Sequence, residues 1–381
     1  MTAYRSPWMT AELETFRSAV RRFVATELVP HEERFKAQHH TDREAWRKAG
    51  ALGLLCTDVP EQYGGSGGDF RTEAVVAEEL GLAGAISLGT SVHSIVANYL
   101  VHLASEEQRL RWLPKMASGE MIGAIAMSEP GVGSDLQGVA TRAERDGDCY
   151  VINGSKTFIT NGYNADLIAV VCKTDPSQGA RGLSILMVET RDLPGFRCGR
   201  FLEKLGQKGQ DTTELFFEDC RVPLDSLLGD AVGQGFFQLM GELPYERTLI
   251  AVSAVAAMER AVALTVEYTK GRKAFGKTLF DLQNTRFKLA EAQTIAHIGR
   301  VFLDSCITRL VAGELDTVTA SMAKWWTTDM QCQVIDDCVQ LHGGYGYMME
   351  YAIAQAYADA RVQRIYGGAN EVMKEIIARS L

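Results

Sequence analysis

The apolar pattern of this chain changes its period twice, and that succession limits the possible folds more than any other feature. Over residues 10–120, apolar side chains recur every three or four positions, as in amphipathic helices, with a glycine-rich break at 64–68. Over 122–222, short strand-like segments and Asn-Gly pairs replace that pattern. From 233 to 381 a long helical period returns. The order of blocks predicts an α+β chain.

The blocks predict three domains: an N-terminal helical domain (1–121), a middle β-domain (122–231) and a C-terminal helical domain (232–381). Clefts form most readily where domains meet, so we expect the active site at these seams. The expected strands cover 150–152, 156–160, 167–172, 183–188 and 214–218, with turns at Asn153-Gly154 and Asn161-Gly162. The longest helical patterns cover 78–103, 249–268, 282–310 and 317–341.

Composition excludes several classes of function. With 381 residues, 46% of them hydrophobic, the chain is long enough for a large core. A net charge of -9 argues against nucleic-acid binding, which needs a basic surface. No apolar run approaches the length of a membrane span and residues 1–17 lack a signal-like apolar segment, which predicts a cytoplasmic protein. The eight cysteines have no paired spacing, so we expect reduced thiols and no metal site.

The segment 127–135, Met-Ser-Glu-Pro-Gly-Val-Gly-Ser-Asp, concentrates polar groups in one turn. Gly131 and Gly133 allow close approach of the backbone to a ligand, and successive amides in such a turn can bind an anion. The hydroxyls of Ser128 and Ser134 would add directed hydrogen bonds. The alternative is an ordinary surface turn, because Ser, Pro, Gly and Asp are common there.

Together with the order of blocks, four segments resemble the acyl-CoA dehydrogenase family over essentially the whole chain. They are the turn at 128–135, the trio Phe158-Ile159-Thr160, the run GRKAFGK at 271–277 and the run QLHGGYG at 340–346. The resemblance implies that family's fold, with a four-helix bundle as the C-terminal domain. It also implies FAD as cofactor, bound between the β-domain and the C-terminal helices.

The resemblance further implies which residues contact the flavin and the substrate. Ser128 would bind the pyrimidine side of the ring, Phe158 would lie against the ring, and Thr160 would reach flavin N5. Arg272 would reach the FAD of a neighbouring subunit. The full set of expected cofactor residues is Ile125, Met127, Ser128, Gly133, Ser134, Phe158, Ile159, Thr160, Arg272, Phe275, Gln283, Gln340, Leu341, His342, Gly343, Gly344, Ala369, Asn370 and Glu371. The expected substrate residues are Ser134, Tyr245, Arg247, Gly367 and Gly368. Considered without the family, Phe158 and Thr160 are alternating residues of a strand, and Arg272 is a charged residue at a helix end.

One departure from the commonest family pattern concerns the catalytic base. Most relatives carry their glutamate directly after the tyrosine of the C-terminal segment, and here that position is Gly367. A branch of the family that includes long-chain and isovaleryl-CoA dehydrogenases carries it on an earlier helix, at the position of Glu246. Leu249 and Ile250 share its helix face, so burial would raise the pKa of Glu246 toward the range of a useful base. The alternative is a solvated glutamate in the first helical turn after Pro244.

Glu242, one turn earlier, is the nearest rival, but it does not match the family position. With Glu246 as base, the resemblance implies that a hydride passes to flavin N5 and that a medium- to long-chain or branched acyl-CoA becomes a trans-2-enoyl-CoA. A backbone N–H, here that of Gly367, would help to hold the thioester carbonyl. An electron-transfer flavoprotein is the expected acceptor and a homotetramer the expected assembly. A flavin-dependent oxidase or monooxygenase and a catalytically silent scaffold on the same fold are the alternatives.

Overall fold

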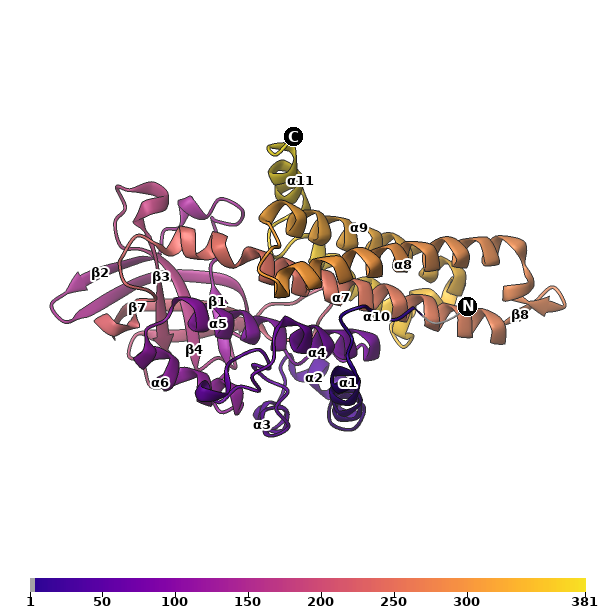
Figure 1. The fold of residues 1–381 in the computed structure, drawn as a ribbon, viewed down its shortest axis with the longest axis horizontal. Helices are drawn as coiled ribbons and strands as arrows, with labels where there is room; N and C mark the ends of the chain where they lie inside the picture. The colour runs from indigo at the N-terminus through magenta and orange to yellow at the C-terminus, as the bar shows by residue number, and fades with distance from the viewer. Residues whose placement is uncertain (1–3) are drawn as a thin grey trace.

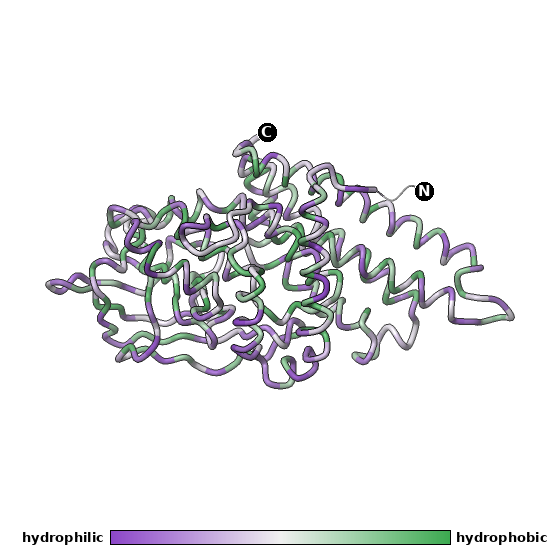
Figure 2. The backbone as a smooth tube through the Cα atoms, turned by 60° about the horizontal axis from the view of Figure 1, so that its bottom comes forward, coloured by the Kyte–Doolittle hydropathy of each residue, from purple (hydrophilic) through white to green (hydrophobic). Residues whose placement is uncertain are grey.

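The computed structural model describes residues 4–381 of the chain. A β-sheet lies at one end of the elongated molecule, long helices extend to the other end, and the N-terminal helices pack beneath both (Figure 1). Hydrophobic stretches gather in the centre of the molecule, whereas the helices alternate hydrophobic and hydrophilic turns (Figure 2). One apolar core joins the N-terminal helices to the long helices, and a second lies on the other face of the sheet. The α+β class predicted from periodicity is confirmed.

The N-terminal block is helical, as predicted, but the helical pattern over 78–103 covers parts of two helices instead of one. Its helices are α1 (Ala11–Phe23), α2 (Glu32–Gln38), α3 (Arg43–Ala51), α4 (Phe70–Ala83), α5 (Thr90–Leu103) and α6 (Glu106–Ala117). The pattern over 78–103 predicted no break, yet α4 ends at Gly84, which has φ +70°. Glycine adopts this left-handed conformation without a Cβ clash, so it ends the helix and the chain turns before α5.

The middle block forms a seven-stranded mixed sheet within the described residues. Its strands are β1 (Gly123–Ala126), β2 (Arg142–Asp146), β3 (Cys149–Thr160), β4 (Leu167–Lys173), β5 (Leu183–Glu189), β6 (Phe196–Phe201) and β7 (Thr212–Pro223). Their order is β1-β4-β2-β3-β7-β6, with β5 on β4. The turn predicted at Asn153-Gly154 is wrong: β3 runs through it with a register shift between Ile152 and Gly154. A β-bulge accommodates the glycine without reversing the strand.

Three long helices form most of the C-terminal block. They are α7 (Gly235–Gly271), α8 (Gln283–Val311) and α9 (Thr317–His342), followed by α10 (Ala352–Ala360) and α11 (Asn370–Ala378). A small hairpin, β8 (Lys273–Ala274) with β9 (Lys277–Thr278), joins α7 to α8. By length and composition α7 could cross a membrane, but 56% of its most apolar window is buried in the protein, as in the core helix of a folded domain.

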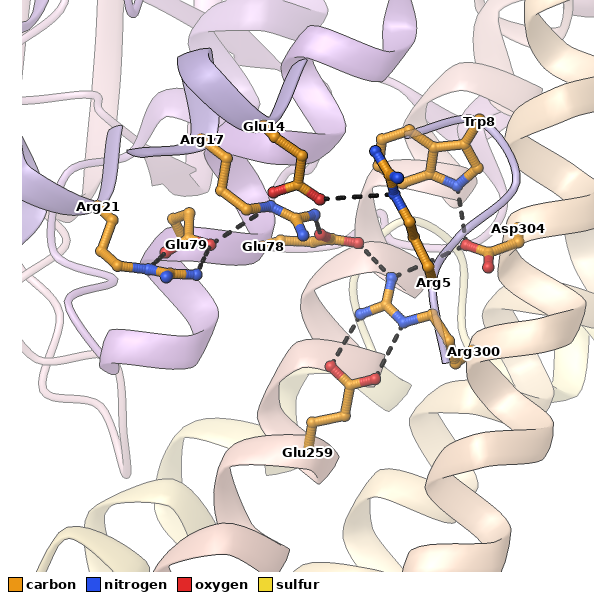
Figure 3. Close-up of polar contacts among 10 residues, drawn as sticks. All are labelled: Arg5, Trp8, Glu14, Arg17, Arg21, Glu78, Glu79, Glu259, Arg300 and Asp304. Atoms are coloured by element: carbon orange, nitrogen blue, oxygen red, sulfur yellow. Dashed lines mark hydrogen bonds and ion pairs between the residues drawn. The ribbon is translucent and has the colours of Figure 1, made fainter. Parts of the chain in front are cut away.

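An ion-pair network fastens α4 to the C-terminal helices (Figure 3). Arg300 of α8 donates to Glu78 of α4 and forms two bonds of 2.9 Å with Glu259 of α7. Arg17 of α1 also reaches Glu78, at 2.5 Å. Glu78 and Arg300 are both buried, so each needs the other as a partner. The network holds α4 against α7, and these two helices form opposite walls of the cavity described next.

Candidate active site

A cavity of about 270 Å³ lies where α4, α7 and α10 meet strands β1 and β3. It is therefore at a seam between the helical and β blocks, where the sequence predicted the site. Residues from distant parts of the chain meet in its wall. The predicted site residues among them are Ile125, Met127, Ser128, Phe158, Ile159, Thr160, Glu246 and Gly367.

Glu246 lies in the wall of this cavity and is 4% exposed. Its carboxylate accepts a hydrogen bond of 2.7 Å from the Tyr99 hydroxyl. Burial raises the pKa of Glu246 to about 7, while the Tyr99 hydrogen bond and the positive Arg247 oppose that rise. The interpretation as a solvated first-turn residue is wrong, because α7 begins at Gly235 and contains Pro244 within it. A carboxylate with such a pKa can accept a proton near neutral pH.

Glu242, the nearest rival, is engaged elsewhere. Its carboxylate accepts bonds from the Asn98 amide at 2.6 Å and from the His102 ring at 3.0 Å. It does not belong to the cavity wall. Geometry therefore favours Glu246 over Glu242 as the residue that faces a bound substrate.

Gly367 faces the same part of the cavity, with φ +62°. A Cβ added there would lie 2.2 Å from the Cδ1 of Ile250, one helical turn beyond Glu246. A side chain on residue 367 would therefore need both a strained backbone and a shift of Ile250. The two candidate positions for the base therefore converge in this cavity, and Glu246 is the one that carries a carboxylate.

The turn at 127–135 lies beside strand β3 and is held by a buried ion pair. Glu129 and Val132 exchange two backbone hydrogen bonds that close the turn. The Lys156 amine, fully buried in β3, donates to the Glu129 carboxylate at 2.9 Å and to the Met127 carbonyl at 3.1 Å. Glu129 thus faces inward. Ser128 is left in the cavity wall.

Phe158 and Thr160 follow this lysine along β3. Phe158 is 70% exposed at the cavity, and its backbone is left-handed, with φ +60°. Such a conformation is costly for an aromatic residue and is often found at functional sites. A register shift between Lys156 and Ile159 allows it. Gly133 and Ser134 are exposed at the outer end of the turn and do not line the cavity.

A second cavity collects another part of the predicted cofactor set. It is lined by Arg272, Gln340, Leu341, His342, Gly343, Gly344 and other residues at the far end of α7 and α9. The Arg272 guanidinium lies 5.8 Å above the Tyr345 ring. At roughly 1.5 Å per residue, this end of α7 is ~39 Å from Glu246, so one FAD in the same subunit cannot contact both. Phe275 and Gln283 are exposed near this end.

Several predicted residues are held by contacts within the protein instead of lining the first cavity. The Tyr245 hydroxyl donates to Asp58 at 2.8 Å. Arg247 is buried and donates to the Ser321 hydroxyl, but its Nε has no partner within residues 4–381. Ala369 and Glu371 flank the start of α11.

Lys324 connects two further predicted residues. Its buried amine donates to the Gly368 carbonyl at 2.7 Å and to the Asn370 side chain at 2.9 Å. Burial lowers the pKa of Lys324 to about 7. Asn370 is therefore buried beside the turn that contains Gly367 and Gly368.

Sequence reasoning missed Tyr99, Lys156 and Lys324, which position the predicted residues. Tyr99 and Glu246 are 147 positions apart, and nothing local marks their contact. Lys156 could have been noticed in the sequence. It is the charged residue of the expected strand 156–160, and its neighbours show no pattern that marks a solvent-facing side. Within the described residues, no group of three or more His, Cys, Asp or Glu side chains could hold a metal ion.

Family profiles match nearly the whole chain: the acyl-CoA dehydrogenase N-terminal domain at residues 10–120, the middle domain at 124–220 and the C-terminal domain at 233–381. The chain belongs to the acyl-CoA dehydrogenase family. It is accordingly an oxidoreductase, and FAD is its cofactor. The resemblance seen in the sequence is confirmed, together with the fold that it implied.

Individual members of the family are similar over most of their length. The mitochondrial long-chain specific acyl-CoA dehydrogenase of Sus scrofa is 48% identical over 98% of this chain and 87% of its own. The structure of an acyl-CoA dehydrogenase from Geobacillus kaustophilus has a TM-score of 0.96, with 47% identity and 99% coverage of both chains. A glutaryl-CoA dehydrogenase from Mycobacterium smegmatis, solved in complex with FADH2, has a TM-score of 0.90, with 28% identity over 98% of this chain and 95% of its own.

The residues present fit FAD. Phe158 offers an exposed aromatic face at the first cavity, and Ser128 and Thr160 add hydroxyls nearby. In the second cavity, a Cβ added at Gly343 or Gly344 would meet no atom within 4 Å, which leaves room for a ligand against the backbone. The first cavity thus supplies an aromatic ring and hydroxyls, which suit a flavin. The second supplies an arginine and a glycine turn, which suit a pyrophosphate.

Proposed function

We propose that the chain catalyses FAD-dependent α,β-dehydrogenation of a medium- to long-chain or branched acyl-CoA thioester, giving a trans-2-enoyl-CoA, with Glu246 as the base. The observation that carries this proposal is the buried Glu246 carboxylate in the cavity wall, with a pKa of about 7 and the Gly367 backbone opposite. FAD, when bound, supplies the acceptor for the hydride that leaves the β-carbon.

The residues around Glu246 prepare it for proton transfer. Leu249 and Ile250 exclude water from the carboxylate, which keeps its pKa high enough to take the α-proton of a thioester. Tyr99 holds one carboxylate oxygen, so the other is the one free to accept the proton. We assign to the Gly367 N–H the role of donor to the thioester carbonyl, where negative charge develops as the α-proton leaves.

An anaerobic titration with acyl-CoA tests this assignment. The purified holoenzyme is mixed with acyl-CoAs of increasing length, and bleaching of the flavin absorbance is followed. Glu246→Gln should reduce its flavin at least about 100-fold more slowly than the wild type, the usual lower bound for loss of a general base. Glu242→Gln is the matched control and should stay near the wild-type rate. A Glu246→Gln variant that keeps a near wild-type rate would exclude Glu246 as the base.

We also propose a homotetramer. The separation of the two cavities supports it, because Arg272 and the Gly343 turn need a second copy if they are to reach an FAD bound near Phe158. Sedimentation of the holoenzyme should give four times the chain mass of 41.8 kDa. Arg272→Met should lower FAD retention on gel filtration. A monomer that retains FAD would refute this assembly.

Three further assignments complete the proposal. Family resemblance supports an electron-transfer flavoprotein as the acceptor, and similarity to bacterial acyl-CoA dehydrogenases supports a cytoplasmic location. Domain boundaries near residues 121 and 231 are supported by the end of α6 at Ala117 and the start of α7 at Gly235. Reoxidation by a purified electron-transfer flavoprotein in air-free buffer, compared with reoxidation by oxygen alone, tests the acceptor. Faster reoxidation by oxygen would favour an oxidase.

A further inference from the structure

The cavity continues from Glu246 along one face of α7. Its lining residues on this helix include Glu246, Ile250, Ser253, Ala257 and Arg260, spaced by four and three positions as one stripe of a helix requires. At roughly 1.5 Å per residue, Arg260 lies ~21 Å beyond Glu246. The side chains between them on this stripe are small or apolar, and the last residue of the stripe is the cationic Arg260.

The opposite wall comes from α4 and makes room for that cation. Gly81 packs so closely on α7 that a Cβ there would lie 2.9 Å from the Ala256 Cβ. Gly84 ends α4, and a Cβ at that position would lie 2.5 Å from the Arg260 guanidinium carbon. The absence of a side chain at Gly84 therefore lets the guanidinium lie at the end of the cavity.

Arg260 is half-buried and has no hydrogen bond or close ion pair within residues 4–381. Burial lowers the pKa of Arg260, and Asp359 and Glu32 act on it only through longer-range attraction. Both carboxylates are bonded elsewhere, Asp359 to the Gln207 N–H and Glu32 to the Ser87 hydroxyl. Arginine stays charged under these conditions, so its donors remain available to a ligand.

Two glutamines that line the same cavity also have side-chain oxygens without hydrogen-bond partners. Gln331 is 1% exposed and Gln363 is 6% exposed, and both line the cavity. The side-chain oxygen of each has no hydrogen-bond partner within the described residues. Buried amide oxygens are normally paired, so two orphaned amide oxygens in the cavity that Arg260 also lines point to a polar ligand in it.

We propose that the distal end of the acyl cavity binds a neutral oxygen substituent, a hydroxyl or keto group, near the far end of a long acyl chain. This inference rests on the proposed function, because it takes Glu246 as the point where C2 of the acyl group lies. A fully extended chain advances about 1.2 Å per single bond, so ~21 Å corresponds to roughly 16 to 18 carbons.

The hydrogen-bonding groups at this end favour a hydroxyl over a carboxylate. Arg260 offers donors, and the two orphaned glutamine atoms are acceptor oxygens. A carboxylate can only accept, whereas a hydroxyl accepts a bond from Arg260 and donates one to a glutamine oxygen. An unsubstituted chain would leave all three polar side chains without partners.

Three matched substrates test the proposal on the holoenzyme: hexadecanoyl-CoA, 16-hydroxyhexadecanoyl-CoA and the mono-CoA ester of hexadecanedioic acid. The wild type should favour the hydroxy substrate over the plain one in kcat/KM by about tenfold or more, mainly through KM. Arg260→Met should bring this ratio toward one, and Arg260→Lys, which keeps one donor group, should give an intermediate ratio. Gln331→Met should also lower it. Arg22→Met, an exposed arginine of α1, is the control and should keep the wild-type ratio.

The outcomes separate the two proposals. Equal kcat/KM for the plain and hydroxy substrates, preference for the dicarboxylic substrate, or a ratio that Arg260→Met does not change would each overturn the distal-oxygen site. In those cases flavin is still reduced, so the proposed function stands. If no acyl-CoA of any length reduces the flavin, the proposed function itself fails.

Discussion

At the residue scale, the proton chemistry depends on one hydrogen-bonded pair, Tyr99 and Glu246. Burial raises the pKa of Glu246, and the hydrogen bond from Tyr99 lowers it, with a balance at about 7. Only the ionised carboxylate accepts a proton, so the active form of the site accumulates as pH rises through about 7.

Tyr99→Phe should shift the pH dependence of flavin reduction. Loss of the hydrogen bond removes an interaction that stabilises the carboxylate, so the pKa of Glu246 rises and more alkaline buffer is needed for half-maximal rate. The rate of single-turnover reduction between pH 5.5 and 9 measures this shift. Tyr357→Phe, on the exposed side of α10, is the control. An unshifted profile in Tyr99→Phe would show that the hydrogen bond does not control the base.

Glu246 should also make the protein less stable at alkaline pH. Its folded pKa lies above its ordinary value of 4.5, so its contribution to stability is complete below about pH 4.5 and is lost as pH rises through about 7. Glu246→Gln cannot ionise, so its free energy of unfolding at pH 8 should exceed that of the wild type by on the order of 3 kcal/mol or less. Denaturant melts at pH 5 and pH 8 measure this difference. If the difference in free energy of unfolding between the variant and the wild type does not increase from pH 5 to pH 8, the burial of Glu246 would be contradicted.

At the element scale, the buried pair Lys156 and Glu129 joins β3 to the turn after β1. The lysine amine reaches carbonyls on both sides, at Met127 and at Val171 of β4, so it fastens three segments at once. Glu129 in turn accepts the N–H groups of Ala140 and Thr141. The position of Ser128 in the cavity wall therefore depends on Lys156, which does not itself line the cavity.

Lys156→Met should lower both stability and FAD retention. The change leaves the Glu129 carboxylate buried and unpaired, which costs about 3–5 kcal/mol. The double variant Lys156→Met with Glu129→Gln removes the unpaired charge and should recover part of that loss. Denaturant unfolding and the flavin-to-protein absorbance ratio are the measurements. Equal losses in the single and double variants would mean that the charge itself is unimportant.

At the scale of the whole molecule, the network around Arg300 links α4 to α7, two helices that also line the cavity (Figure 3). Its members come from the N-terminal segment, α1, α4, α7 and α8. The same network is remote from the reacting groups. We expect it to govern stability and acyl-chain fit, with no direct part in proton transfer.

Arg300→Met should reduce the free energy of unfolding by about 3–5 kcal/mol, because it leaves Glu78 buried with one cation fewer. Arg21→Met is the matched control. The Arg21 side chain is 63% exposed, so its ion pair with Glu79 contributes about 0–1 kcal/mol. Thermal and denaturant melts of both variants check the contrast. Similar losses in the two would show that burial does not strengthen the network.

Much of the fold was predictable because periodicity reports burial directly. The strands at 167–172 and 183–188 and the helices at 282–310 and 317–341 agree with β4, β5, α8 and α9 to within one or two residues. The errors at Gly84 and at Asn153-Gly154 share a cause. A glycine permits a helix end, a turn or a bulge, and only long-range pairing decides among them.

The sequence by itself determined the order of helical and β blocks and the family. It also showed that Gly367 occupies the commonest position of the base, so that Glu246 is the expected base. These follow from local patterns and from residue identity at known positions. Tertiary structure decided the rest: that Tyr99 meets Glu246, that Glu129 faces Lys156, and that Arg260 lines the same cavity as Glu246. The electrostatic environment of each of these residues depends on burial. Burial is decided by how the whole chain packs, and no single segment of the sequence determines it.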